Sequence, residues 1–112
     1  MKIMKNLDTQ EEFEQLIEDS RKKPQILLKH STRCPISRGA MSECKRFAKR
    51  DNSADIWTLL VVENRELSQA VADQTGIEHR SPQAIIFRDG RPVWKGSHYD
   101  IIAEDLSAKI AE

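Results

Sequence analysis

The chain is poor in cysteine, glycine and proline, and neither sign of charge predominates. Two cysteines among 112 residues exclude a fold held together by several disulfides. With only four glycines and four prolines, the sequence contains no low-complexity tract, flexible linker or internal repeat. Eighteen basic residues balance eighteen acidic ones, so no overall field draws the protein to nucleic acid or to an anionic membrane. We therefore expect neither of these partners.

Long hydrophobic runs are also missing. A run such as Leu59 to Val62 is far short of the roughly 20 residues that span a bilayer. The N-terminus lacks the apolar stretch of about 7 to 15 residues that is typical of a signal peptide. A chain of this length buries roughly two-thirds of its unfolded surface in one core. We expect residues 1–112 to form a single cytoplasmic domain.

Four apolar segments predict strands, at 25–30, 56–62, 84–87 and 92–95. The segment 56–62 is apolar almost without alternation, which is typical of a strand covered on both faces, and we expect it to be central. Asp89 and Gly90 predict a hairpin turn between the last two strands. Pro92 predicts that the last strand lies at an edge, because proline cannot donate to an inner ladder. Residues 2–4 are compatible with one more short edge strand.

The helical spacing of apolar residues predicts four helices. The first begins at Thr9-Gln10-Glu11-Glu12, which has the form of a capping box, and ends before Pro24. The second runs from Pro35 to about Arg50. The third is capped by Asn64 and ends at Gly76, and the last opens at Ser97 or Asp100. The inward residues expected for these helices are Phe13, Leu16 and Ile17; Ile36, Ala40, Cys44, Phe47 and Ala48; Leu67, Ala70 and Val71; and Ile102, Leu106 and Ile110.

The order of elements is βαβαββα with a possible extra strand in front. It predicts an α/β fold in which a mixed sheet of four to five strands carries helices on both faces.

The chain is organised around Cys34, which lies where an apolar strand stops and a helix begins. Pro35 suits the first helical position, where its missing N–H is no loss. The Cys34 sulfur then sits at a helix N-terminus, where free amides and the positive end of the dipole favour a thiolate. Arg33 is expected to add positive charge. This position predicts a reactive thiol, although a structural thiol at a strand end is the simpler alternative.

Cys44 and the histidines have plainer interpretations. Ten residues along a helix is about 15 Å, so Cys44 cannot form a disulfide with Cys34 in the native helix. It lies on the apolar stripe and is expected to be a small buried hydrophobe. The same distance excludes a zinc site shared by the two cysteines, and no metal is predicted. His30, His79 and His98 are candidate proton relays, although surface or capping roles are commoner for histidine.

Three motifs carry a resemblance to a known family. Thr32-Arg33-Cys34-Pro35-Ile36-Ser37, Ser81-Pro82-Gln83 and Ser97-His98 are similar to segments of the monothiol bacilliredoxins, whose active site reads T-C-P-I-S. Here Arg33 interrupts that string, and the C-P-I-S core is intact. The order of elements resembles the thioredoxin fold along nearly the whole chain.

The resemblance implies a thiol-disulfide oxidoreductase that removes bacillithiol from S-thiolated proteins, with bacillithiol as co-substrate and no bound cofactor. It implies that Cys34 attacks and that Ser37 stands where dithiol relatives have a resolving cysteine, with Pro35 between them. It also implies a cis Pro82 that faces Cys34. Thr32, Arg33, Ser81 and Pro82 are then the residues expected to contact substrate.

Two other functions stay open at this stage. One is a monothiol glutaredoxin-like protein that uses glutathione or binds an iron–sulfur cluster between two subunits through Cys34. The other is a redox-inactive interaction module that keeps the fold as a scaffold, because a fold by itself does not establish an activity.

Overall fold

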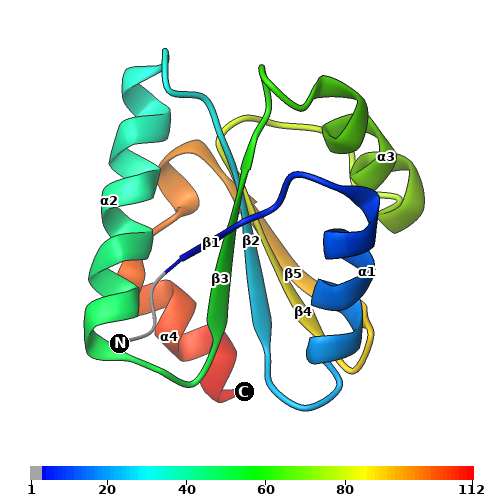
Figure 1. Ribbon diagram of the computed structural model, residues 1–112. Helices are drawn as coiled ribbons and strands as arrows, with labels where there is room; N and C mark the ends of the chain where they lie inside the picture. The colour runs from blue at the N-terminus through cyan, green and yellow to red at the C-terminus, as the bar shows by residue number, and fades with distance from the viewer. Residues whose placement is uncertain (1–3) are drawn as a thin grey trace.

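A mixed five-stranded sheet lies between two pairs of helices in the computed structural model, which describes residues 4–112 (Figure 1). The elements are β1 (Lys5–Asn6), α1 (Gln10–Asp19), β2 (Gln25–His30), α2 (Pro35–Arg50), β3 (Asp55–Leu60), α3 (Arg65–Thr75), β4 (Gln83–Arg88), β5 (Arg91–Ser97), the 3-10 turn η1 (His98–Asp100) and α4 (Ala103–Ala111). This confirms the predicted order and the helices on both faces. Of the strand considered at 2–4, residues 1–3 lie outside the described residues, and the short edge strand begins at Lys5.

The strand order is β1-β3-β2-β4-β5, so the central strand is β2 and the prediction for 56–62 was wrong. β3 is parallel to β1 and to β2, whereas β4 is antiparallel to both β2 and β5. The apolar run of β3 shows that both of its faces are covered, but it does not show which strands flank it. β3 also ends at Leu60, and Val62 lies exposed in the turn that follows.

The hairpin between β4 and β5 agrees with its prediction. Asp89 and Gly90 both have left-handed backbone angles, with φ of 56° and 85°, as a type I′ turn requires. β5 is an edge strand and carries Pro92, whose lack of an N–H is tolerated there. Both strands are longer than the apolar runs that predicted them.

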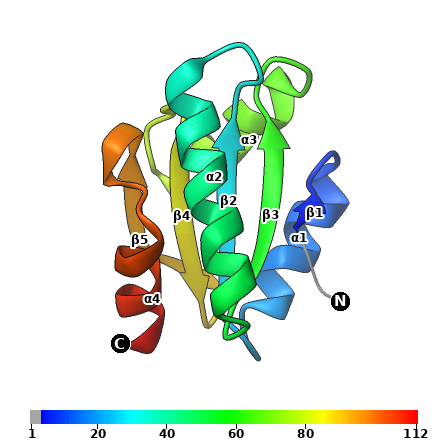
Figure 2. The same cartoon turned by 90° about the vertical axis from the view of Figure 1, so that its left-hand side faces the viewer.

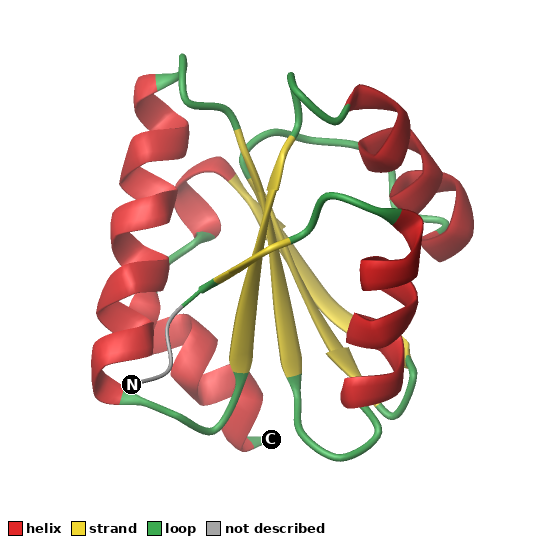
Figure 3. Cartoon of the chain, viewed as in Figure 1, coloured by secondary structure: helices red, strands yellow, loops and turns green. Residues whose placement is uncertain are grey.

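Each face of the sheet is covered by one pair of helices, as the two views and the secondary-structure colouring show (Figures 2 and 3). α2 and α4 enclose a core with one set of strand side chains, and α1 and α3 enclose a core with the alternate set. The first core includes Ile26, Leu28, Ala40, Cys44, Phe47, Ile56, Ile86, Leu106 and Ile110, and the second includes Phe13, Leu16, Leu27, Trp57, Leu59, Leu67, Val71, Ile85 and Phe87. No helix within residues 4–112 is long and apolar enough to cross a membrane.

The ends of α1 and α3 largely follow their sequence signals. Thr9 and Glu12 form the complete capping box. Gly76 ends α3 in the left-handed conformation, with φ of 72°. Asn64 is the N-cap residue of α3, but its side chain donates to Asp8 Oδ1 at 3.1 Å instead of capping the helix.

The start of α4 differs from the prediction. Ser97 precedes η1, and α4 begins only at Ala103, with Ile102 as its N-cap residue. Ile102 is 38% exposed rather than inward. The Ala103 N–H donates to Glu43 Oε1 of α2 at 2.9 Å, so a carboxylate from a neighbouring helix takes the place of a local capping side chain. No local sequence signal marks such a start.

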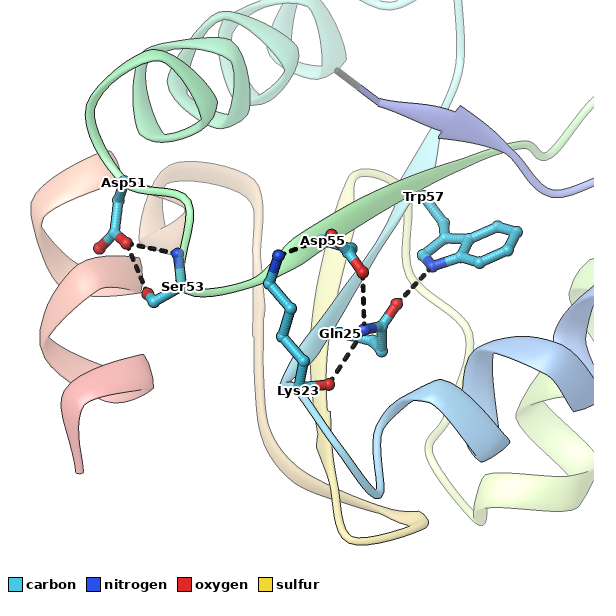
Figure 4. A network of polar contacts seen from close by, with 6 residues as sticks. All are labelled: Lys23, Gln25, Asp51, Ser53, Asp55 and Trp57. Atoms are coloured by element: carbon cyan, nitrogen blue, oxygen red, sulfur yellow. Dashed lines mark hydrogen bonds and ion pairs between the residues drawn. The ribbon is translucent and has the colours of Figure 1, made fainter. Parts of the chain in front are cut away.

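A polar network closes the end of the sheet where β2 and β3 begin (Figure 4). Gln25 is buried, and its amide donates to the Lys23 carbonyl and to Asp55 Oδ2, each at 3.0 Å. Its Oε1 accepts from Trp57 Nε1 at 2.8 Å. Because both the nitrogen and the oxygen of its buried amide are hydrogen-bonded, Gln25 holds β2 against β3 with little desolvation penalty.

Lys29 is the unexpected residue of the core. It lies in β2 with no exposed surface, and its side chain reaches the α3 side of the sheet, where Nζ donates to the Ser68 carbonyl at 3.0 Å. Burial lowers its pKa to about 8. The run Ile26-Leu27-Leu28 predicts the strand, but a single lysine after it gives no sign of being buried.

We expect Lys29→Met to raise the free energy of unfolding at pH 7 by as much as about 3 kcal/mol, since burying the ammonium opposes folding. Between pH 8 and 10.5 the unfolded state binds more protons at Lys29 than the folded state does, so the wild type gains stability with rising pH. The advantage of Lys29→Met should shrink across this window. Denaturant unfolding of both proteins from pH 7 to 10.5 measures the difference between their free energies of unfolding. Groups that titrate alike in both proteins do not contribute to this difference. A pH-independent difference would contradict the assignment.

Candidate active site

Cys34 is the N-cap residue of α2 and Pro35 is the first helical residue, as the sequence predicts. The chain leaves β2 at His30, turns through 31–33, and enters the helix with an extended backbone at Cys34. The Cys34 N–H donates to the Ser31 carbonyl at 3.4 Å, and the Cys34 carbonyl accepts the first helical bond from the Arg38 N–H at 3.1 Å. The thiol is partly exposed and makes no capping hydrogen bond.

The first turn of α2 lowers the pKa of Cys34. The largest cause is the backbone N–H of Ser37, followed by the backbone N–H of Ile36. Desolvation opposes these two effects, and the Ser37 hydroxyl and the charge of Arg38 lower the pKa further by smaller amounts. Arg33 is not among the causes, so the positive charge expected from Arg33 comes from Arg38, one helical turn beyond the sulfur.

Ser37 is fully buried, and its Oγ has no hydrogen-bond partner within residues 4–112. A buried hydroxyl without a partner is costly unless a partner forms in another state of the site. The Cys34 thiolate is such a partner, because Ser37 Oγ lowers the pKa of that thiol. Ser37 is thus placed to donate to the thiolate.

Ser81 and Pro82 reach the same end of the sheet as Cys34. Their peptide bond is cis, as the family resemblance implied. The next residue, Gln83, pairs with Lys29 where β2 ends, and the Pro82 carbonyl accepts from the His98 N–H at 3.1 Å. The loops that follow β2 and precede β4 lie at this end (Figure 1).

A groove of about 360 Å³ begins at the first turn of α2 and runs to η1 and the start of α4. Its lining includes Pro35, Ile36, His98, Tyr99 and Ile102. Tyr99 is 78% exposed, which leaves one wall of the groove free to contact a bound molecule. Sequence analysis missed Tyr99 and assigned Ile102 to the core, because no pattern indicated the 3-10 turn that contains Tyr99 or the later start of α4 at Ile102.

The three histidines occupy different environments. His30 is only 6% exposed, and burial lowers its pKa against an opposing effect of the Ser37 backbone. His79 Nδ1 lies 3.2 Å from Lys29 Nζ and 3.2 Å from Ser68 Oγ. His98 has a left-handed backbone, with φ of 55°. A surface role therefore does not describe His30.

Cys44 lies in the core between α2 and the sheet with no exposed surface. Burial and the charge of Glu43 raise the pKa of its thiol to about 12, so it stays protonated at neutral pH. This confirms the small buried hydrophobe that the stripe predicted. In the part of the chain that the structure describes, no three His, Cys, Asp or Glu side chains are grouped as a metal site.

Comparison with known proteins identifies the family of the chain. The family model described as Monothiol bacilliredoxin BrxC matches residues 5–106. The chain belongs to the BrxC family. Membership agrees with the resemblance stated from the motifs, and it associates the chain with bacilliredoxin thiol-disulfide chemistry.

Solved structures confirm the thioredoxin fold. A protein described as a proposed oxidoreductase with a thioredoxin fold is 38% identical, with a TM-score of 0.87, over 98% of this chain and 95% of that one. Thioredoxin of Malassezia sympodialis is 13% identical, with a TM-score of 0.78, over 99% and 90% of the two chains. Thioredoxin of Fasciola hepatica is 19% identical, with a TM-score of 0.76, over 96% and 97%. The two thioredoxins support the fold only.

We expect Cys34 to react with iodoacetamide at a pH below the ordinary pKa of a thiol, and Cys44 to stay unmodified in the folded protein. Ser37→Ala and Arg38→Gln should each shift the Cys34 alkylation profile to higher pH, because each removes a group that favours the thiolate. Arg33→Gln is the matched control and should leave the profile in place. Alkylation rate against pH, followed by peptide mass, measures this. An equal shift for the two arginine variants would contradict the geometry.

Proposed function

We propose that this chain removes bacillithiol from S-thiolated proteins through one attacking thiol, Cys34. The observation that carries the proposal is the position of Cys34 as the N-cap residue of α2, where two backbone N–H groups lower the pKa of its thiol. Family membership supports the chemistry of the site. Residues 1–112 are proposed to act as one domain in the cytoplasm, where small thiols are kept reduced.

In the first step the Cys34 thiolate attacks the bacillithiol sulfur of the mixed disulfide. A disulfide forms between Cys34 and bacillithiol while the disulfide to the client breaks. The client sulfur leaves as a thiolate and takes a proton from solvent, so the client is reduced and Cys34 is oxidised. A low pKa at Cys34 favours this step, because only the thiolate is nucleophilic.

In the second step a further bacillithiol thiolate attacks the bacillithiol sulfur bound to Cys34. Bacillithiol disulfide is released, and Cys34 leaves as a thiolate. Ser37 cannot take over this step, because a hydroxyl does not form a disulfide, and Cys44 is buried and protonated. The resolving thiol therefore comes from outside the chain.

Substrate contacts are proposed on two sides of the motif. Thr32 and Arg33 are exposed in the turn before Cys34, and Arg33 offers a cation to an anionic small thiol. Ser81 and Pro82 offer backbone groups to an extended client segment, in the manner of an added strand. Pro35 keeps the first helical position without an N–H of its own, which leaves the next two amides for the sulfur.

We expect Cys34→Ser to abolish release of bacillithiol from an S-bacillithiolated protein, whereas Cys44→Ala should retain turnover within about twofold of the wild type. The measurement is release of the small thiol from a client, with intact mass of the enzyme. The wild type should carry one bacillithiol after reaction with bacillithiol disulfide, and peptide mapping should place it on Cys34.

Oxidised glutathione supplies the comparison arm of this experiment. Faster exchange with glutathione than with bacillithiol would contradict the proposed co-substrate. Loss of turnover in a folded Cys44→Ala variant would contradict the one-thiol cycle.

Ser37→Cys should convert the cycle to a two-thiol cycle. Residues 34 and 37 are the N-cap and third residues of α2, close enough for a disulfide with little backbone movement. The variant should expel bound bacillithiol unaided and lose two hydrogens on mild oxidation, which intact mass and peptide mapping detect. Ser68→Cys is a control that places a thiol on α3 and should form no bond with Cys34. A stable bacillithiol adduct on Ser37→Cys would contradict this geometry.

A further inference from the structure

The buried ammonium of Lys29 is not used by the proposed cycle. It lies in the central strand, and it is absent from the causes that lower the pKa of Cys34. A charged group held away from water costs stability, and burial accordingly lowers the pKa of Lys29. Burying Lys29 lowers stability without an electrostatic effect on the Cys34 thiol, so its presence in the core needs another explanation.

The contacts of Lys29 lead to the segment 76–82 between α3 and β4. Nζ lies 3.2 Å from His79 Nδ1, and it also donates to the Ser68 carbonyl. Ser68 Oγ lies at 3.2 Å from the same Nδ1. With the His79 proton on Nε2, Nδ1 accepts from both the lysine and the serine. Burial lowers the pKa of His79, and the charges of Lys29 and Arg80 lower it further, which favours that neutral form.

Gln83 adds a second tie to the same segment. It stands directly opposite Lys29 in the β2–β4 ladder, so the two side chains share one face of the sheet. Its Nε2 donates to the Glu78 carbonyl at 3.1 Å. Lys29 and Gln83, which face each other on neighbouring strands, therefore hold His79 and Glu78, which are consecutive in the loop.

The segment held in this way ends at the active site. Ser81 and Pro82 follow His79 closely, and the Pro82 carbonyl is bound by the His98 N–H. His98 lines the groove together with Pro35 and Ile36, the residues after Cys34. The contacts thus run from Lys29 through the loop to the surface beside the thiol.

We propose that Lys29 is a positioning residue, which through His79 holds the Pro82 loop in the position that binds the client beside Cys34. The inference rests on the proposed function and adds a residue that no motif marks. Because Lys29 acts on the loop rather than on the sulfur, it should affect client binding and leave thiol reactivity unchanged.

The test compares Lys29→Met with Lys23→Met, a control that removes a lysine just before the opposite end of β2. For Lys29→Met we expect KM for an S-bacillithiolated protein to rise about tenfold, with kcat and the iodoacetamide rate at Cys34 within about twofold of the wild type. Amide hydrogen exchange at 77–81 should be faster by at least about tenfold. Lys23→Met should match the wild type in all of these measurements.

His79 variants give a second test that leaves the core intact. His79→Leu removes the acceptor and should show the same rise in KM and in hydrogen exchange as Lys29→Met. In the double variant KM should be no higher than in either single variant. His79→Asn retains an acceptor near the position of Nδ1 and should largely restore KM.

An unchanged KM in both Lys29→Met and His79→Leu would overturn the proposal. A fall in the alkylation rate of Cys34 that accompanies the rise in KM in these variants would also overturn it. A wild type that releases no small thiol from any client would refute the proposed function instead. In that case hydrogen exchange still decides the role of Lys29, because unchanged exchange at 77–81 would overturn it.

Discussion

The candidate active site depends on the amides at the start of α2, which have no acceptor within the helix. In most helices the N-cap side chain is an oxygen that accepts from the second or third residue. Here the N-cap residue is Cys34, and the amides that lower the pKa of its thiol belong to Ile36 and Ser37, the second and third residues. Cys34 has no oxygen that could cap the helix, so these amides are left to favour the thiolate. The arrangement holds because the buried face of α2 is packed against the sheet along its length.

The two faces of the sheet treat titratable groups differently. On the α2 side Cys44 is enclosed by apolar neighbours, and because its thiol stays neutral, no charge is buried there. On the α3 side Lys29 is enclosed just as fully, but a carbonyl and a neutral imidazole accept from its ammonium. The α2 side thus leaves Cys34 as the thiol available for the proposed reaction, and the α3 side carries the polar contacts that reach the Pro82 loop.

Sequence patterns recovered the parts of the fold that local rules determine. The bounds of β2 and α2, the capping box at Thr9 and the turn at Asp89-Gly90 each follow from spacing or from one residue's conformational preference. The errors arose where distant residues decide. Glu43 caps α4 from another helix, and β3 is displaced from the centre by the order of pairing. The burial of Lys29, for which the sequence made no prediction, likewise depends on partners from α3 and the following loop. At the site, the position of Cys34 was predictable, but the effect of Arg38 on its pKa and the exposure of Tyr99 depend on the three-dimensional arrangement of the chain.

A one-thiol cycle imposes a geometric condition that these features meet together. In the proposed cycle the same sulfur must face a client and then a small thiol, because neither Ser37 nor the buried Cys44 can resolve the intermediate. Two surfaces meet beside it, the groove bounded by Tyr99 and the loop that carries Pro82, and the bond from His98 N–H to the Pro82 carbonyl joins them. A displacement of the loop would therefore also change one wall of the groove. The stability lost to a buried lysine is consistent with this condition, since a positioning error of about 1 Å at a reacting centre costs on the order of 100-fold in rate, a free energy similar to that lost by burying the ammonium.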